Sequence, residues 1–73
     1  MKPLDELLIG ESCKIVRIDA SELVKRRLMD LGITKGITVK MLMQAPLKDP
    51  IAIRVRGCTL ALRRSEAKKI FVE

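Results

Sequence analysis

The chain has 73 residues, a length that allows one small domain with a single core. Hydrophobic residues make up 48% of it, which argues against disorder, but its apolar runs are far shorter than the ~18 residues of a membrane-spanning helix. The net charge of +6 indicates an acidic partner, nucleic acid or a phosphate-rich surface, unless it serves solubility alone.

Several residue types that carry chemistry are absent from the sequence. There is no histidine, tryptophan or tyrosine, and Phe71 is the only aromatic residue. The usual general acid–base group near neutral pH is therefore missing, and no P-loop, GxSxG or GxGxxG motif is present. These absences indicate a binding protein rather than an enzyme, and we expect no cofactor.

The two cysteines, Cys13 and Cys58, lie far apart in the sequence and form no CxxC motif. A secreted domain of this size usually carries more cysteines, so we expect reduced thiols inside the cell. A single bridge or a metal site shared by these two thiols is the weaker interpretation. Asp5 and Glu6 interrupt any signal-peptide core, and the expected location is the cytoplasm.

The first half of the chain predicts a turn, a strand and a helix. Residues 3–10 are expected to cover one end of a barrel, and residues 12–18, which mix β-branched and polar side chains, to form a strand. Ser21 is a suitable N-cap for a helix, and Gly32 follows the helix end. The apolar stripe of this helix consists of Val24, Leu28 and Leu31.

The opposite side of this helix also carries apolar content. Leu23 and Met29 fall on opposite flanks of the stripe, and Arg26 points away from it. Glu22 stands four residues before Arg26, a spacing that allows an ion pair. The pattern therefore predicts an exposed surface that includes large apolar side chains.

After residue 36 the hydrophobic period changes to two, which indicates strands. The first spans residues 37–44, with inward side chains at Ile37, Val39, Met41 and Met43. The second spans residues 51–56, with inward side chains at Ile51, Ile53 and Val55. Residues 59–63 form a third, with Leu60 and Leu62 inward, followed by a helical turn over 65–69 and a closing strand over 70–72.

These elements predict a mainly β fold with one α-helix between the first and second strands. Short strands joined by tight turns must close on themselves to cover their edges and bury a core. We therefore predict a small SH3-like barrel of about five strands, a single domain over residues 1–73. On the same alternation four cations point outward and form a basic face: Lys40, Arg54, Arg56 and Arg63.

Three short motifs follow one another along the chain. The first is Arg27-Leu28 followed by Leu31-Gly32-Ile33 and Gly36; the second is Ala45-Pro46-Leu47 with Asp49-Pro50-Ile51; the third is Leu60-Ala61-Leu62-Arg63-Arg64 with Glu66-Ala67. In this order and spacing the chain resembles the FeoA family, small cytoplasmic proteins of bacterial and archaeal ferrous-iron uptake. The resemblance extends from about residue 4 to residue 72.

The resemblance implies a partner, the FeoB-type membrane transporter for ferrous iron, whose cytoplasmic portion is a GTP-binding domain. The protein would then be an accessory or regulatory subunit, peripheral to the membrane through that partner. We expect the helix and its exit turn to be the contact surface, although core packing competes as the explanation for Leu28. The partner-binding candidates are Leu23, Arg26, Arg27, Leu28, Met29 and Gly32.

A sharper hypothesis is that one arginine acts on the transporter's GTPase as an arginine finger. The candidates are Arg26, Arg27, Arg63 and Arg64. The alternative function is RNA binding by the basic face, which the lack of aromatic side chains for base stacking disfavours. Self-association through an edge strand, with Leu42 and Leu47 as leftover apolar residues, stays open.

Overall fold

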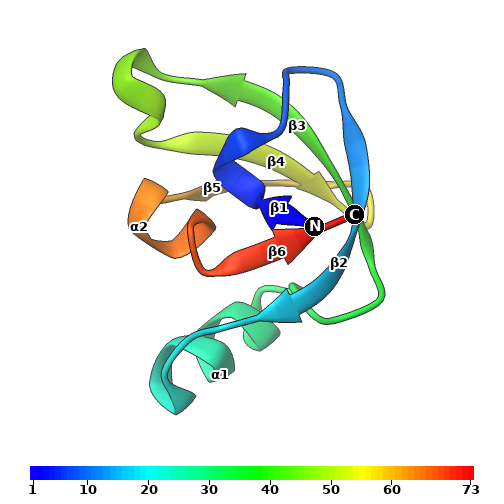
Figure 1. Ribbon diagram of the computed structural model, residues 1–73, viewed down its shortest axis with the longest axis vertical. Coiled ribbons are helices and arrows are strands. Elements are labelled where there is room, and N and C mark those ends of the chain that lie inside the picture. Colours follow the sequence, from blue (N-terminus) through cyan, green and yellow to red (C-terminus); the bar gives the residue numbers. More distant parts are fainter.

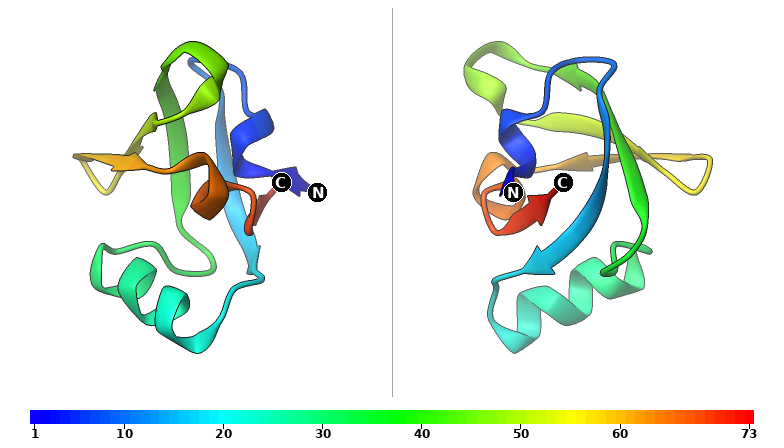
Figure 2. Two further views of the ribbon diagram at one scale, coloured as in Figure 1. Left: turned by 90° about the vertical axis from the view of Figure 1, so that its left-hand side faces the viewer. Right: turned by 45° about the vertical axis from the view of Figure 1, so that its right-hand side comes forward.

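Six strands form one antiparallel sheet that curls around the core in the order β1-β6-β2-β3-β4-β5 (Figures 1 and 2). This computed structural model describes residues 1–73, with the side chain of Lys48 left out. The strands are β1 (Lys2–Pro3), β2 (Ser12–Ile18), β3 (Thr38–Gln44), β4 (Ile51–Val55), β5 (Cys58–Leu62) and β6 (Ile70–Val72). The helices are α1 (Glu22–Asp30) and α2 (Arg64–Ala67), with 3-10 turns η1 (Leu4–Glu6) and η2 (Pro46–Lys48).

The helix α1 lies between β2 and β3, as the sequence predicts, and it closes one end of the curled sheet (Figure 1). The structure also contains a two-residue strand, β1, which the sequence did not predict. It pairs with β6, Lys2 opposite Val72 and Pro3 opposite Phe71. A strand of two residues is too short to show any hydrophobic period.

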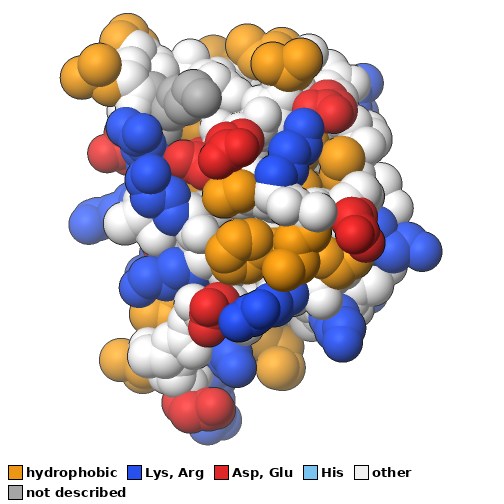
Figure 3. Space-filling model, viewed as in Figure 1, with side chains coloured by type: hydrophobic (Ala, Val, Ile, Leu, Met, Phe, Trp, Pro, Cys, Tyr) orange, Lys and Arg blue, Asp and Glu red, His pale blue; other side chains and the backbone are white. Residues whose placement is uncertain are grey.

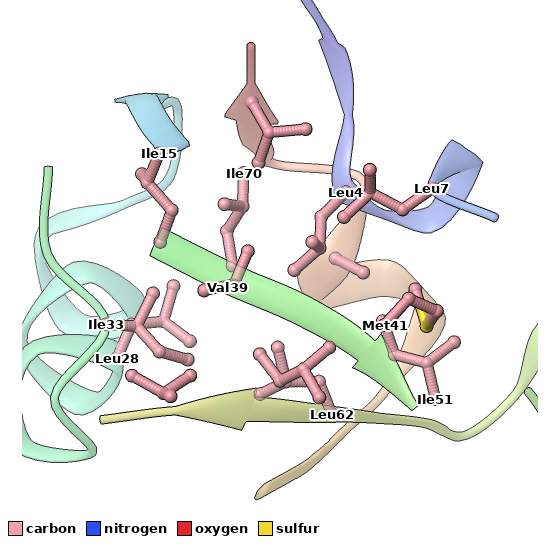
Figure 4. Close-up of a cluster of buried hydrophobic side chains, with 14 residues drawn as sticks. Leu4, Leu7, Ile15, Leu28, Ile33, Val39, Met41, Ile51, Leu62 and Ile70 are labelled. Atoms are coloured by element: carbon pink, nitrogen blue, oxygen red, sulfur yellow. The ribbon is translucent and has the colours of Figure 1, made fainter. Parts of the chain in front are cut away.

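The core gathers side chains from strands β2 to β6 and from both helices (Figure 4). In β4 the predicted alternation holds, because Ile51, Ile53 and Val55 are at most 2% exposed. In β5 the inward residues are Leu62, which is buried, and Leu60, which packs partly buried against the core. The remaining core residues are Leu4, Leu7, Ile15, Leu28, Ile33, Val39, Met41, Ala67, Ile70 and Val72.

A β-bulge in β3 changes which side chains face the core. Met41 pairs with Ile53, yet Met43 pairs with Ala52, so Leu42 is an extra residue on β3. Such an insertion shifts the alternation of the residues that follow it. Met43, expected to point inward, is therefore on the outer surface with 66% of its area exposed.

Two other expectations about side chains, on the burial of Leu31 and on an ion pair of Glu22 with Arg26, were wrong. Leu31, assigned to the inward stripe of the helix, is 40% exposed because it stands at the C-cap, where the helix has ended. Phe71 is half-buried, and the guanidinium carbon of Arg17 lies 5.9 Å from the centre of its ring. Glu22 and Arg26 do not form an ion pair, and neither is in any ion pair among the described side chains.

Charged groups fasten the N-terminal segment to the barrel. Asp5, whose side chain is 5% exposed, lies 3.5 Å from Arg64 Nε and 3.7 Å from Lys68 Nζ, which joins η1 to α2. Glu11 accepts a hydrogen bond from the backbone N–H of Leu8 at 2.9 Å and lies 3.2 Å from Lys2 Nζ. No helix in the described chain has the length and apolarity needed to cross a bilayer.

The contacts of Glu11 predict a pH effect. The hydrogen bond from Leu8, and then the one from Lys2, lower the pKa of this carboxyl below its ordinary value of 4.5. Because the pKa of Glu11 is lower in the folded state, its ionised carboxylate stabilises the fold at pH values above the ordinary pKa. This stabilisation is lost as the pH falls through the lowered pKa of the folded state. An NMR titration should give a midpoint below 4.5 for Glu11, and a midpoint at or above 4.5 would contradict these contacts.

Leu28 is fully buried and holds α1 against the core. We expect Leu28→Ala to reduce the free energy of unfolding by about 2–5 kcal/mol, because it leaves a cavity. The control is Leu23→Ala on the same helix, at a position that is 82% exposed, which should change stability by at most about 0.5 kcal/mol. Urea denaturation checks both, and equal effects would show that α1 is not anchored through Leu28.

Candidate partner-binding surface

The start of α1 is capped as its sequence predicts. Ser21 has extended backbone angles, and its Oγ accepts a hydrogen bond from the N–H of Val24 at 3.3 Å. Glu22 in the first turn places a negative charge near the positive end of the helix dipole. These features fix the first residue of the helix without any contact to the core.

The end of α1 forms a Schellman motif around Gly32. Gly32 has a φ of +89°, a left-handed conformation that glycine adopts without a steric penalty. Its N–H donates to the carbonyl of Met29 at 2.9 Å, and the N–H of Ile33 donates to the carbonyl of Leu28 at 2.9 Å. Leu28 and Ile33 are both fully buried and lie side by side in the core (Figure 4).

Because Leu28 and Ile33 face the core, the other side of α1 faces solvent. Leu23 is 82% exposed and Met29 is 60% exposed, so both present apolar area to solvent. Arg26 is exposed between them and takes part in no ion pair among the described side chains. The structure thus brings Leu23, Arg26 and Met29 together on one surface, which we call the α1 surface.

Arg27 is held by an intramolecular contact. Its Nη2 lies 2.6 Å from Oε2 of Glu66, whose side chain is only 9% exposed. The other oxygen of Glu66 accepts a hydrogen bond from the backbone N–H of Arg63 at 3.0 Å, at the start of α2. One carboxylate therefore caps α2 and ties α1 to it. Sequence reasoning missed this role of Glu66 because 39 positions separate the partners.

Two depressions border the α1 surface. The first, with a volume of about 680 Å³, runs along the outer side of α1, from Glu22 and Leu23 to Asp30. The second has a volume of about 240 Å³ and lies between α1, the end of β2 and the segment before β3. Its floor is apolar and its rim is cationic: Ile18, Lys25, Met29, Ile33, Thr34 and Lys35. Apart from Met29, these residues were not predicted, because they come from separate segments with no common local pattern.

The predicted basic face is continuous only in part. Lys40 and Arg54 are direct cross-strand neighbours on β3 and β4, and both are exposed. Arg56 is exposed in the β4–β5 turn with a φ of +51°, while Arg63 lies beyond the other end of β5, where its backbone begins α2. Arg63 is four residues past Thr59, the partner of Arg54, which corresponds to about 14 Å along a strand.

The two cysteines lie on strands that are not neighbours, contrary to the arrangement considered from the sequence. The half-buried Cys13 is on β2 and the exposed Cys58 on β5, with β3 and β4 between them. Three strand spacings separate them by about 14 Å. Over the described residues, no cluster of three or more potential metal ligands is found.

The family of the chain follows from comparison with known proteins. The model of the FeoA domain matches residues 2–73. This chain belongs to the FeoA family. It is 43% identical to a FeoA-like protein from Clostridium acetobutylicum, covering 99% of this chain and 84% of that one with a TM-score of 0.88. FeoA of Stenotrophomonas maltophilia complexed with zinc, described as a procaryotic SH3 domain protein, is 34% identical with a TM-score of 0.83 and covers 100% and 91% of the two chains.

A third relative is a larger protein. The Fe(2+) transport protein A/Fe(2+) transporter FeoB fusion protein of Porphyromonas gingivalis is 36% identical over 70 residues. The match takes in 96% of this chain and 8% of that protein, so the chain spans a small part of its length.

The mainly β, SH3-like fold is confirmed by the two FeoA structures from Clostridium acetobutylicum and Stenotrophomonas maltophilia. A manganese-dependent transcriptional repressor shares the fold at 23% identity, with a TM-score of 0.91.

The pair between Arg27 and Glu66 can be tested by a double-mutant cycle with Arg27→Met and Glu66→Gln. The glutamine retains an oxygen for the N–H of Arg63, so the cycle isolates the contact between the helices. We expect a coupling free energy of about 1 kcal/mol from urea denaturation, because one of the two groups is buried. Additive effects would show that the pair does not position α1.

Proposed function

We propose that this FeoA-family protein is a non-enzymatic accessory subunit of ferrous iron uptake that binds a FeoB-type transporter on its cytoplasmic side. The observation that carries the proposal is the Porphyromonas gingivalis relative, in which a homologous segment is part of one chain with the transporter. Fusion makes the contact between two modules intramolecular and raises their effective concentration. Two partners that work together gain from such an arrangement.

We further propose that the contact is with the GTP-binding domain and is made by the α1 surface. The α1 surface combines an exposed leucine, a flexible methionine and an arginine that has no ion pair among the described side chains: Leu23, Met29 and Arg26. Arginine is enriched at the energetic centres of interfaces, and methionine adapts to irregular partner surfaces. Leu28, by contrast, is buried and Gly32 shapes the exit turn, so neither supplies side-chain contact area.

The arginine-finger hypothesis now favours one residue among four. Arg27 is paired with Glu66, and Arg64 donates to the carbonyl of Leu47 and lies 3.5 Å from Asp5. Arg63 is the N-cap of α2 and is not among the residues that line the outer side of α1. Arg26 is therefore the candidate for insertion into the nucleotide site of the partner, where it would stabilise the developing charge of GTP hydrolysis.

Titration into the purified transporter and into its isolated GTP-binding domain, in the apo, GDP and GTP-analogue forms, tests the proposal. We expect saturable binding, weakened at least about tenfold by Leu23→Asn or by Arg26→Gln because both lie at the contact. The control is Leu47→Asn, which removes an equally exposed leucine (86%) from the other end of the molecule. None of these variants should lower the melting temperature appreciably, because all three replaced side chains are exposed.

The outcomes separate the parts of this proposal. If the protein does not bind even the intact transporter in any nucleotide state, the accessory function is wrong. Binding that Leu47→Asn weakens as much as Leu23→Asn would place the contact elsewhere. A rate of GTP hydrolysis that does not change when the wild-type protein is added would exclude the catalytic function of Arg26.

A further inference from the structure

Four large apolar side chains are exposed at the end of the molecule opposite α1. They lie in the loop after η1, near the end of β3 and in the connection between β3 and β4. Figure 3 shows hydrophobic side chains at this end. The two segments are adjacent, because the side chain of Gln44 donates to the carbonyl of Leu7 at 2.8 Å. We call this group the apolar apex: Leu8 (72% exposed), Ile9 (65%), Met43 (66%) and Leu47 (86%).

The exposed Leu47 has a strained backbone conformation. Its φ is +65° and its ψ is 17°, the left-handed region that is unfavourable for a leucine. Core packing does not explain a leucine here, because the side chain is 86% exposed. Strained residues that the fold retains are often part of a functional surface.

The apolar apex continues into cationic residues on the outer face of the sheet. Met43 is three residues from Lys40 on β3, and its partner Ala52 is two residues from Arg54 on β4. Lys40 and Arg54 are directly opposite each other, and like charges in this position destabilise a sheet. A nearby anionic partner would offset their repulsion.

We propose that the apolar apex and the Lys40–Arg54 pair dock on the surface of an anionic phospholipid membrane. Projecting apolar side chains beside cations are typical of proteins that lie at a membrane interface, where the apolar groups enter the headgroup region and the cations face acidic lipids. The side chains of the apex project into solvent from two loops and from the end of β3, which suits a fluid interface better than a shaped protein partner. This proposal goes beyond the transporter contact and uses different residues.

The geometry makes the two contacts compatible. The molecule extends 29 Å along its longest axis, with the apex at one end and α1 at the other (Figure 1). With the apex on the membrane, α1 would face the cytoplasm, where a cytoplasmic domain of the transporter could reach it. A weak membrane contact would then add to a weak protein contact, because each raises the local concentration for the other.

Sedimentation with lipid vesicles tests the proposal. The probes are vesicles of phosphatidylcholine alone and of phosphatidylcholine mixed with phosphatidylglycerol, at low and high salt. We expect the full chain to bind the mixed vesicles more tightly, and more weakly at high salt. Leu47→Asn should weaken binding about tenfold, because it removes an inserted side chain while asparagine tolerates a positive φ. Lys40→Gln with Arg54→Gln should weaken it about 25-fold, or about fivefold for each cation.

Matched controls lie at the α1 end. Leu23→Asn removes a leucine of similar exposure, and Lys25→Gln with Lys35→Gln removes two cations, so both should leave vesicle binding nearly unchanged. Equal binding to both kinds of vesicle, or none, would overturn the proposal. Equal weakening by the controls would show that net charge alone attracts the protein, and would also overturn it.

Two other occupants are distinguishable in the same experiments. If Leu47→Asn abolishes a dimer in sedimentation velocity but leaves vesicle binding unchanged, the apex pairs two copies of this chain and the proposal is wrong. If the Lys40 and Arg54 variant loses binding to single-stranded RNA but not to mixed vesicles, the cations bind nucleic acid and the proposal is also wrong. Because the vesicles contain no transporter, either result is independent of the transporter contact.

Discussion

The burial of Leu28 and Ile33 at the end of α1 is the constraint on which the candidate partner-binding surface depends. The Schellman hydrogen bonds around Gly32 bring these two side chains to the same side of the chain, where they complete one end of the barrel core. A helix of nine residues has little stability in isolation, so this burial both forms the helix and sets its rotation. Leu23 and Met29 are exposed as a geometric consequence.

Local sequence patterns were sufficient to predict most of the fold. Alternation identified β4 from Ile51, Ile53 and Val55, and the residues Ser21 and Gly32 marked the limits of α1. The bulge at Leu42 could not be predicted, because it depends on how β3 pairs with β4 and not on β3 alone. Strand β1 gave no periodic signal because it has only two residues.

The part of the candidate site that lies on one helix was predictable from the sequence, and the part that joins distant segments was not. Leu23, Arg26 and Met29 follow from the helical period, since they lie off the apolar stripe. The pairing of Arg27 with Glu66 and the depression between α1 and the end of β2 arise from segments far apart in the sequence. Such contacts become visible only when the barrel is closed, because no short segment contains both partners.

The ends of the chain meet on one side of the barrel, where the N-terminal amino group lies 3.9 Å from a carboxylate oxygen of Glu73 and β1 pairs with β6. Adjacent termini let a fold be inserted into a loop of another protein or joined to it by either end. Here a host chain attached at this position would leave both α1 and the opposite loops uncovered. The barrel can therefore be joined to other domains without remodelling either of the two surfaces proposed as contacts.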